Sequence, residues 1–274
     1  MTTPDGSSSV APTMIVPAAT MTEVQEIITQ HVKDSAKTLV ALDVDMTLIV
    51  SKHPALHYPN RAKYKAVLRK IFEPLNALEK DRVWTFATQT HGEQLIEENI
   101  PAIIQSIQAQ GIKTIAFTAL LTGRLGNLEH GEVLRFQKLQ SLDIDFQQAF
   151  ADTAFVLADI PAYNGHHPVY HQGILYANGE GGQHTKGTVL VAFLQQVSFS
   201  PQLVVMVDDI RKNLEDTQQA LVTFDPSVQF IGITYLGAYT YAPEGISEKA
   251  FAAFWQGMAA KLVPKTHLSS SPIN

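Results

Sequence analysis

Short, uninterrupted apolar runs that alternate with segments of helical periodicity constrain this chain more than any other feature. The runs cover Thr38–Asp43, Lys113–Thr118, Leu203–Val207 and Gln229–Tyr235. A strand that is apolar at every position is buried on both faces, as in a parallel sheet covered by helices. The pattern therefore predicts an α/β fold with a central, mostly parallel sheet and helices on both faces.

The segments between these runs carry apolar residues at spacings of three and four, which indicates amphipathic helices. We predict helices over residues 22–32, 64–75, 92–110, 189–197 and 246–262. The segment Val169–Ala177 has Gly173 between two β-prone runs, so we expect a hairpin or a bent strand there.

The composition excludes several classes of protein. The chain has 274 residues, of which 45% are hydrophobic and 17% charged, so it can bury a substantial core and is not a wholly disordered protein. A formal net charge of −6 argues against a broad surface for nucleic acid. Because the chain has no cysteine, disulfides, thiolate metal sites and cysteine nucleophiles are excluded.

The N-terminal residues bear on the expected location. No run reaches the roughly 18 apolar residues of a membrane-spanning helix, so no span is expected. Asp5, Pro12 and Pro17 make a poor secretory signal of the first residues. We therefore expect a cytoplasmic protein, with export as the alternative if Met1 was added to a trimmed chain.

Two pairs of acidic residues stand at the ends of apolar runs: Asp43 and Asp45 after the first run, and Asp208 and Asp209 after the third. In open α/β sheets, ligands bind beyond the carboxyl ends of the strands. Two carboxylates with separate tasks suit phosphoryl transfer, since one can attack phosphorus and the other can handle the leaving-group proton. Adjacent acids with no nearby base suit Mg²⁺. Taken alone, each pair also fits a helix cap or a turn.

A hydroxyl and a lysine occupy two further positions of the same kind. Thr118 ends the second apolar run, and Lys186-Gly187 opens a helix after a glycine-rich segment. A hydroxyl and free amides at a strand-to-helix turn can hold a phosphate oxygen, and a lysine can neutralise a phosphoryl group and nearby carboxylates. Taken alone, such a threonine is usually a cap and such a lysine is usually solvated.

The order of these positions resembles the four motifs of the haloacid dehalogenase-like superfamily over roughly residues 38–237. Asp43-Val-Asp45-Met-Thr47 is similar to the first motif, Thr118 to the second, Lys186 to the third and Asp208-Asp209 to the fourth. Local similarity over residues 173–176, 186–190 and 231–235 points to an uncharacterised bacterial branch.

This resemblance implies a Rossmann-like core and a phosphatase-type hydrolase that uses Mg²⁺. Asp43 would be the nucleophile that forms an aspartyl-phosphate, and Asp45 the general acid and later the base. Thr118 and Lys186 would hold the phosphoryl oxygens. The ion would be bound by Asp43, the backbone carbonyl of Asp45 and Asp208, with Asp209 acting through water.

We therefore expect a Mg²⁺-dependent phosphomonoester hydrolase that acts on a small phosphorylated substrate. Two alternatives stay open. One is a non-catalytic module that binds metal or phosphate, and the other is a phosphotransferase or mutase with an acceptor other than water. The sequence specifies neither the substrate nor the oligomeric state.

The domain organisation follows from composition and from the spacing of the motifs. Residues 1–20, rich in Ser, Thr, Pro and Ala, predict a mobile arm, and residues 263–274 a polar tail, with the core over residues 21–262. We expect a small helical cap at about residues 50–90, centred on Arg61–Lys80, where it can cover the site.

Several polar residues outside the motifs are candidate substrate contacts. Arg124, His53 and His57 belong to this set, together with the loop Asp159–His171. His166, His167 and His171 suggest zinc, but without helical context or an acidic partner we expect a solvated loop. Trp84 and Phe86 are expected to pack in a short apolar segment, with no role toward a cofactor.

Overall fold

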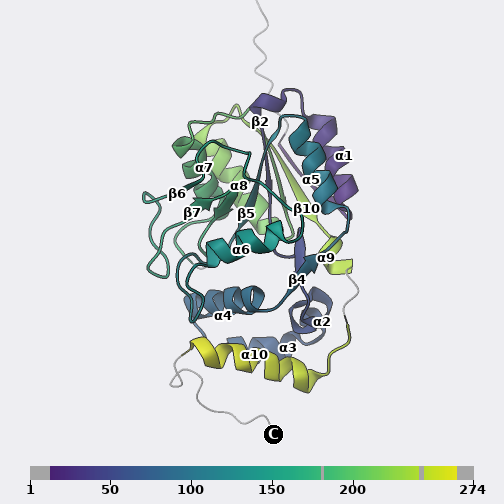
Figure 1. The fold of residues 1–274 in the computed structure, drawn as a ribbon, viewed down its shortest axis with the longest axis vertical. Coiled ribbons are helices and arrows are strands. Elements are labelled where there is room, and N and C mark those ends of the chain that lie inside the picture. The colour runs from purple at the N-terminus through teal and green to yellow at the C-terminus, as the bar shows by residue number, and fades with distance from the viewer. Residues whose placement is uncertain (1–12, 180–181, 241–243, 264–274) are drawn as a thin grey trace, which may run out of the picture.

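The computed structural model describes residues 13–179, 182–240 and 244–263. Its centre is an 8-stranded sheet in the order β1-β10-β9-β2-β5-β8-β7-β6 (Figure 1). Neighbouring strands are parallel from β1 to β8, and β7 and β6 continue the sheet as antiparallel strands. The predicted α/β fold with a mostly parallel central sheet is confirmed.

The strands of the large sheet are β1 (Met14–Ala18), β2 (Thr38–Leu42), β5 (Lys113–Thr118), β6 (Ala154–Val156), β7 (Val169–His171), β8 (Ile174–Tyr176), β9 (Leu203–Asp208) and β10 (Gln229–Tyr235). A separate antiparallel pair consists of β3 (Ile49–Ser51) and β4 (Glu93–Leu95).

The helices are α1 (Met21–His31), α2 (Tyr58–Lys63), α3 (Lys65–Phe72), α4 (Ala77–Thr90), α5 (Ile100–Ala109), α6 (Gly131–Gln140), α7 (Lys186–Gln196), α8 (Arg211–Phe224), α9 (Gly237–Thr240) and α10 (Glu248–Leu262). Two short 3-10 helices are η1 (Ser35–Lys37) and η2 (Pro54–Leu56).

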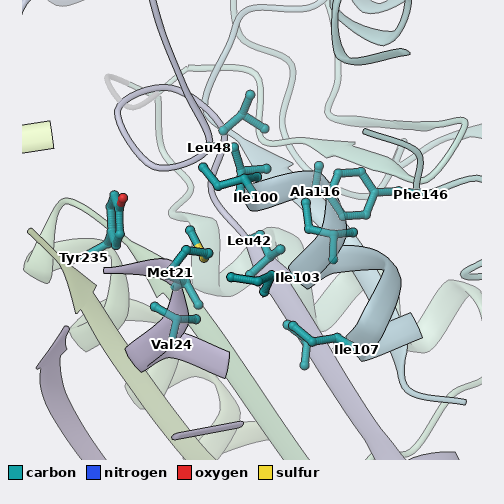
Figure 2. Packing of buried hydrophobic residues seen from close by; sticks show 14 of the residues in the cluster. Met21, Val24, Leu42, Leu48, Ile100, Ile103, Ile107, Ala116, Phe146 and Tyr235 are labelled. Carbon is teal, nitrogen blue, oxygen red and sulfur yellow. The ribbon is translucent and has the colours of Figure 1, made fainter. Parts of the chain in front are cut away.

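The central strands bury both faces because successive side chains point to opposite sides of the sheet. Val40 and Leu42 of β2 belong to a core that includes residues of α1 and α5. Leu39 and Ala41 belong to a second core with residues of α7 and α8. Figure 1 shows these helix pairs on opposite sides of the sheet, and Figure 2 shows Leu42 close to Ile103 in the first core. Helices on both faces are thereby confirmed.

A helical layer lies beyond the carboxyl ends of the parallel strands (Figure 1). The chain enters it from β3 and returns through β4, so α2, α3 and α4 form an insertion between the first two motifs. This is the position expected for a small cap at about residues 50–90. The C-terminal helix α10 packs against α3 and α4 and shares their apolar cluster. Our assignment of that helix to the core was wrong, because its apolar face is buried by the insertion instead of by the sheet.

Two boundaries also differ from the sequence-based expectation. Met14–Ala18 is not an arm but the edge strand β1, paired in parallel with β10, and Pro17 is tolerated there because an edge strand can lack one donor. Residues 1–12 and 264–274 lie outside the described residues. The helix predicted from Gly92 begins at Ile100, since Glu93–Leu95 pairs with β3 and Pro101 stands in the first helical turn.

Candidate functional site

Three neighbouring parallel strands end at one place in the sheet. β2 lies between β9 and β5, so the residues that follow or end these strands meet at a common edge. Asp43 follows β2, Asp208 ends β9 and Thr118 ends β5. The topology thus brings together the strand-end residues that are far apart in the sequence.

Lys186, from the first turn of α7, joins this group. Its Nζ lies 2.6 Å from Oδ1 of Asp43 and 2.7 Å from Oδ2 of Asp208, and it donates a third bond to the carbonyl of Phe117 at 3.1 Å. All of its donors are therefore used within the site. Gly187 permits this position of α7, because a Cβ there would lie 2.5 Å from the carbonyl oxygen of Asp216 in α8.

The acidic side chains are also held by local hydrogen bonds. The hydroxyl of Thr47 donates to Oδ2 of Asp43 at 2.9 Å. Asp208 accepts from the backbone N–H of Ile210 at 2.9 Å and from Nδ2 of Asn213 at 3.1 Å. These bonds fix the direction of both carboxylates before any ligand arrives.

Burial and like charge dominate the electrostatics of the site. Burial raises the pKa of Asp43 to about 7, with Asp208 adding to the effect and Lys186 opposing it. Burial, together with Asp43 and Asp208, also raises the pKa of Asp209 well above its usual range. Burial by itself would lower the pKa of Lys186, but Asp208 and Asp43 raise it above its usual value. The site therefore disfavours the ionised forms of Asp43 and Asp209 unless a further cation is present.

Three carboxylates that share one lysine fit a hard divalent cation, which would favour their ionised forms. Asp43, Asp208 and Asp209 can each place a carboxylate oxygen within 4.8 Å of the others. Oxygen-only ligands in small number suit Mg²⁺, which retains several of its waters. The Asp45 side chain is not part of this group, so its predicted contribution to the ion is confined to the backbone carbonyl.

Asp45 belongs to a second buried network, which the sequence analysis missed. Nη2 of Arg135, on α6, lies 2.9 Å from Oδ1 and 3.2 Å from Oδ2 of Asp45. Nη1 of the same guanidinium lies 2.9 Å from Oε1 of Glu93, at the base of the cap. The Arg135 side chain is 0% exposed, against 22% for Asp45 and 4% for Glu93. The hydroxyl of Thr118 reaches Asp45 Oδ2 at 3.5 Å.

A cavity of about 290 Å³ lies over these residues, between the core and the cap. Its lower wall includes Asp43, Asp45, Thr118, Asp208 and Asp209. The cap contributes the rest of the polar and aromatic wall, namely Arg61, Phe72, Lys80, Asp81, Trp84 and Thr85. Residues of the insertion therefore form part of the cavity wall together with the residues at the strand ends. Trp84 was expected only to pack, yet it lines this cavity as well as stacking on Trp255.

The candidate substrate contacts lie elsewhere. Arg124 is exposed and bonds to the carbonyl of Gly126. His53 accepts from the N–H of Ala55 and stacks on Phe254, and His57 is buried against the carbonyl of Ser51. None of these three lines the described cavity wall, since their side chains serve the turn at Arg124 and the packing of the cap.

The histidine-containing loop does not form a metal centre in the part of the chain that the structure describes, where the one such group is the aspartate set. His167 bonds to the carbonyl of Ile160, and the ring of His171 lies edge-on to Phe136. Tyr163 of this loop lies beside Asp81 of the cap, and burial together with the Asp81 carboxylate raises the pKa of its phenol. The loop thus meets the cavity through Asp81 and not directly.

Comparison of the sequence with known protein families identifies the family of this chain. The profile of the family described as "Protein of unknown function (DUF2608)" matches residues 17–262. The chain belongs to this family. The match begins in β1 and ends in α10, so a DUF2608 domain includes the core, the cap and the helix that packs on the cap.

Two curated relatives come from Rickettsia. An uncharacterized protein of Rickettsia bellii (strain RML369-C) is 24% identical over 202 residues, covering 72% of this chain and 68% of the relative. Uncharacterized protein RP296 of Rickettsia prowazekii (strain Madrid E) is 23% identical over 235 residues, covering 85% and 79% respectively. No solved structure matches the chain. Among the described residues, no helix is long and apolar enough to cross a membrane.

Proposed function

We propose that this DUF2608 protein is a haloacid dehalogenase-like, Mg²⁺-dependent phosphomonoester hydrolase. The observation that carries the proposal is the buried set of Asp43, Asp208, Asp209 and Lys186 at the ends of adjacent parallel strands, beneath a capped cavity. The cavity is at the small end of the range for ligand pockets, which favours a small phosphorylated substrate.

Asp43 is the group best placed to attack phosphorus. Lys186 and Thr47 hold its two oxygens, and the carboxylate faces the cavity. In the first step an oxygen of Asp43 bonds to phosphorus, the bond from phosphorus to the leaving alcohol breaks, and the alcohol takes up a proton. In the second step water attacks the aspartyl-phosphate, which releases inorganic phosphate and regenerates the carboxylate.

The negative charge of both partners opposes such an attack, so cations are required. Bound Mg²⁺, held by Asp43, Asp208 and Asp209, would neutralise phosphoryl oxygens as a Lewis acid. Lys186 offsets the charge of Asp43 and Asp208, and its donors are already filled by them and by Phe117. We therefore assign Lys186 mainly to the carboxylates, and we assign the phosphoryl oxygens to Thr118.

Asp45 is the proposed acid for the leaving group and the base for water. It lies next to Thr118 on the cavity wall, but both of its oxygens accept from Arg135. One oxygen must turn toward the cavity before a proton can move to or from the reacting group. Arg135 is a positioning residue in this scheme, and through Glu93 it connects the acid to the strand on which the cap is carried.

The test is hydrolysis of aryl phosphates and a panel of small metabolite phosphates with Mg²⁺. We expect turnover that EDTA removes, and we expect Asp43→Asn to lower kcat by at least about 10³-fold. Mass spectrometry after an acid quench should find phosphate on Asp43. The control is Asp34→Asn, an exposed N-cap at which Asn caps equally well.

Each alternative has its own result. Equal activity of Asp43→Asn would eliminate Asp43 as the nucleophile. If the protein hydrolysed no phosphoester but still bound Mg²⁺, the result would contradict the hydrolase and favour a non-catalytic metal-binding module. A phosphorylated product that appears only with added alcohols or sugars would indicate a phosphotransferase.

A further inference from the structure

Arg61 stands on the cap side of the cavity, within electrostatic reach of Asp209. It lies in α2 and lines the same cavity as Asp43 and Asp209. Its guanidinium carbon is 4.3 Å from the centroid of the Trp84 ring and 5.8 Å from that of Tyr58. A guanidinium stacked on an aromatic face keeps its N–H donors in its own plane, where they remain directed at other groups.

No protein group uses those donors in the described part of the chain. The Arg61 side chain forms neither a hydrogen bond nor an ion pair within 4.0 Å there, and its Nε is fully buried without a partner. Arginine carries five N–H donors, and a buried charge is normally paired. The Nε of Arg135, the other arginine near the site, also lacks a partner, but both terminal nitrogens of Arg135 are paired with carboxylates. The two arginines therefore differ in their terminal nitrogens, which are paired in Arg135 and available to a ligand in Arg61 as far as the described residues show.

The surroundings of Arg61 define what it can bind. Asp209 is the carboxylate that acts on it most strongly, yet it forms no ion pair with Arg61. Lys80 lines the same wall and is half-buried, so the cap side of the cavity offers a second cation. Phe72 and Trp84 supply apolar surface beside both residues. An anion attached to a small apolar or aromatic body fits this wall.

We infer that the cavity takes small phosphomonoesters that carry a second anionic group, with Arg61 binding that group and Trp84 the body between the two anions. This inference rests on the proposed function for the phosphoryl end only. The second anion is a carboxylate or another phosphate, since both accept paired bonds from a guanidinium.

Non-hydrolysable phosphonates test the inference without turnover. Benzylphosphonate carries one anionic group, and 4-carboxybenzylphosphonate carries a second at the far end of the same ring. Calorimetric titration with Mg²⁺ present should show that wild-type protein binds the carboxylated compound about 10- to 100-fold more tightly, as expected for charged hydrogen bonds. Arg61→Met should remove most of that preference. The control is Arg69→Met, which makes the same change at an exposed position of α3 outside the cavity wall.

The outcomes separate the two proposals. Equal affinity of wild-type protein for both phosphonates, or a preference that survives in Arg61→Met, would overturn the second-anion site. If Arg61→Met lost the same factor of affinity for both phosphonates, Arg61 would bind the phosphoryl group. That result would also overturn the second-anion site. A third compound, which carries a 4-phosphonomethyl group in place of the 4-carboxylate, shows whether the site prefers a phosphate-like anion or a carboxylate as the second anion. Failure of hydrolysis with the preference intact would eliminate the hydrolase and retain the binding site.

Discussion

At the residue scale, Arg135 is a buried cation that two carboxylates share. It is fully buried between Asp45 and Glu93, and its removal would leave Asp45 without a cation and Glu93 with only Lys138, whose Nζ lies 3.5 Å from Oε1 of Glu93. We expect Arg135→Met to lower the free energy of unfolding by about 3–5 kcal/mol, measured by urea denaturation. Glu93→Gln in the same protein should restore part of the loss, since one unpaired charge is then absent.

A matched arginine outside the network serves as control. Arg211→Met removes an exposed pair with Glu215 on α8, and we expect a change below about 0.5 kcal/mol. If Arg135→Met and Glu93→Gln were strictly additive, the buried network would not be an energetic unit. Because Arg135 positions Asp45, the folded fraction of Arg135→Lys should also show an altered pH profile of kcat, which a purely structural role would not produce.

At the element scale, the contact between α10 and the segment after β3 makes the stability of the fold depend on pH. His53 stacks on Phe254 of α10 at a centroid distance of 4.0 Å and lies edge-on to His91. Burial lowers the pKa of His53 below 6.5, and His91 and His57 lower it further. The stability associated with neutral His53 is therefore present above pH 6.5 and is lost as the pH falls toward the pKa of the folded state.

We expect His53→Asn to reduce the loss of unfolding free energy between pH 7.5 and pH 5.5, measured by urea titration at both values. Asn has no charge to gain, so it removes this contribution to the slope. His130→Asn, at the exposed start of α6, makes the same change away from α10 and should retain the wild-type slope. If His53→Asn lost as much unfolding free energy between pH 7.5 and pH 5.5 as the wild-type protein, His53 would not make this contact sensitive to pH.

At the scale of the whole molecule, Mg²⁺ should stabilise the fold. An ion that binds only the folded state at ten times its Kd adds about 1.4 kcal/mol, which raises Tm by about 3–6 °C for a chain of this size. Asp209→Asn should abolish most of this increment. It should not lower the Tm of the metal-free protein, because burial and two neighbouring carboxylates already disfavour the Asp209 charge.

Differential scanning fluorimetry with EDTA and with Mg²⁺ measures both effects. The decisive comparison is within each protein, with and without the ion. A Tm that rises equally in wild-type protein and in Asp209→Asn would exclude Asp209 from the ion site. A fall in the metal-free Tm of Asp209→Asn would show that its carboxylate is stabilising, contrary to the electrostatics of the folded state.

The sequence by itself determined the central sheet and the residues at its carboxyl edge. Runs that are apolar at every position specify buried strands locally, and an acid at the end of such a run stands where the strand leaves the core. Asp43, Thr118 and Asp208 could therefore be assigned to one edge once the strands were taken as parallel. Lys186 was assigned to the site only through the resemblance of the four motifs, since a lysine at the start of a helix is usually solvated.

The tertiary structure alone decided which other residues complete the site. Arg135 and Arg61 lie on helices, where an arginine in sequence is indistinguishable from one on a solvated face. Only packing shows that Arg135 is paired with carboxylates, whereas Arg61 is stacked on aromatic rings and has no ion pair among the described residues. The same holds for α10, whose apolar stripe fits a sheet as well as a cap. Local pattern fixes which face is apolar, whereas the partner of that face depends on contacts between distant parts of the chain.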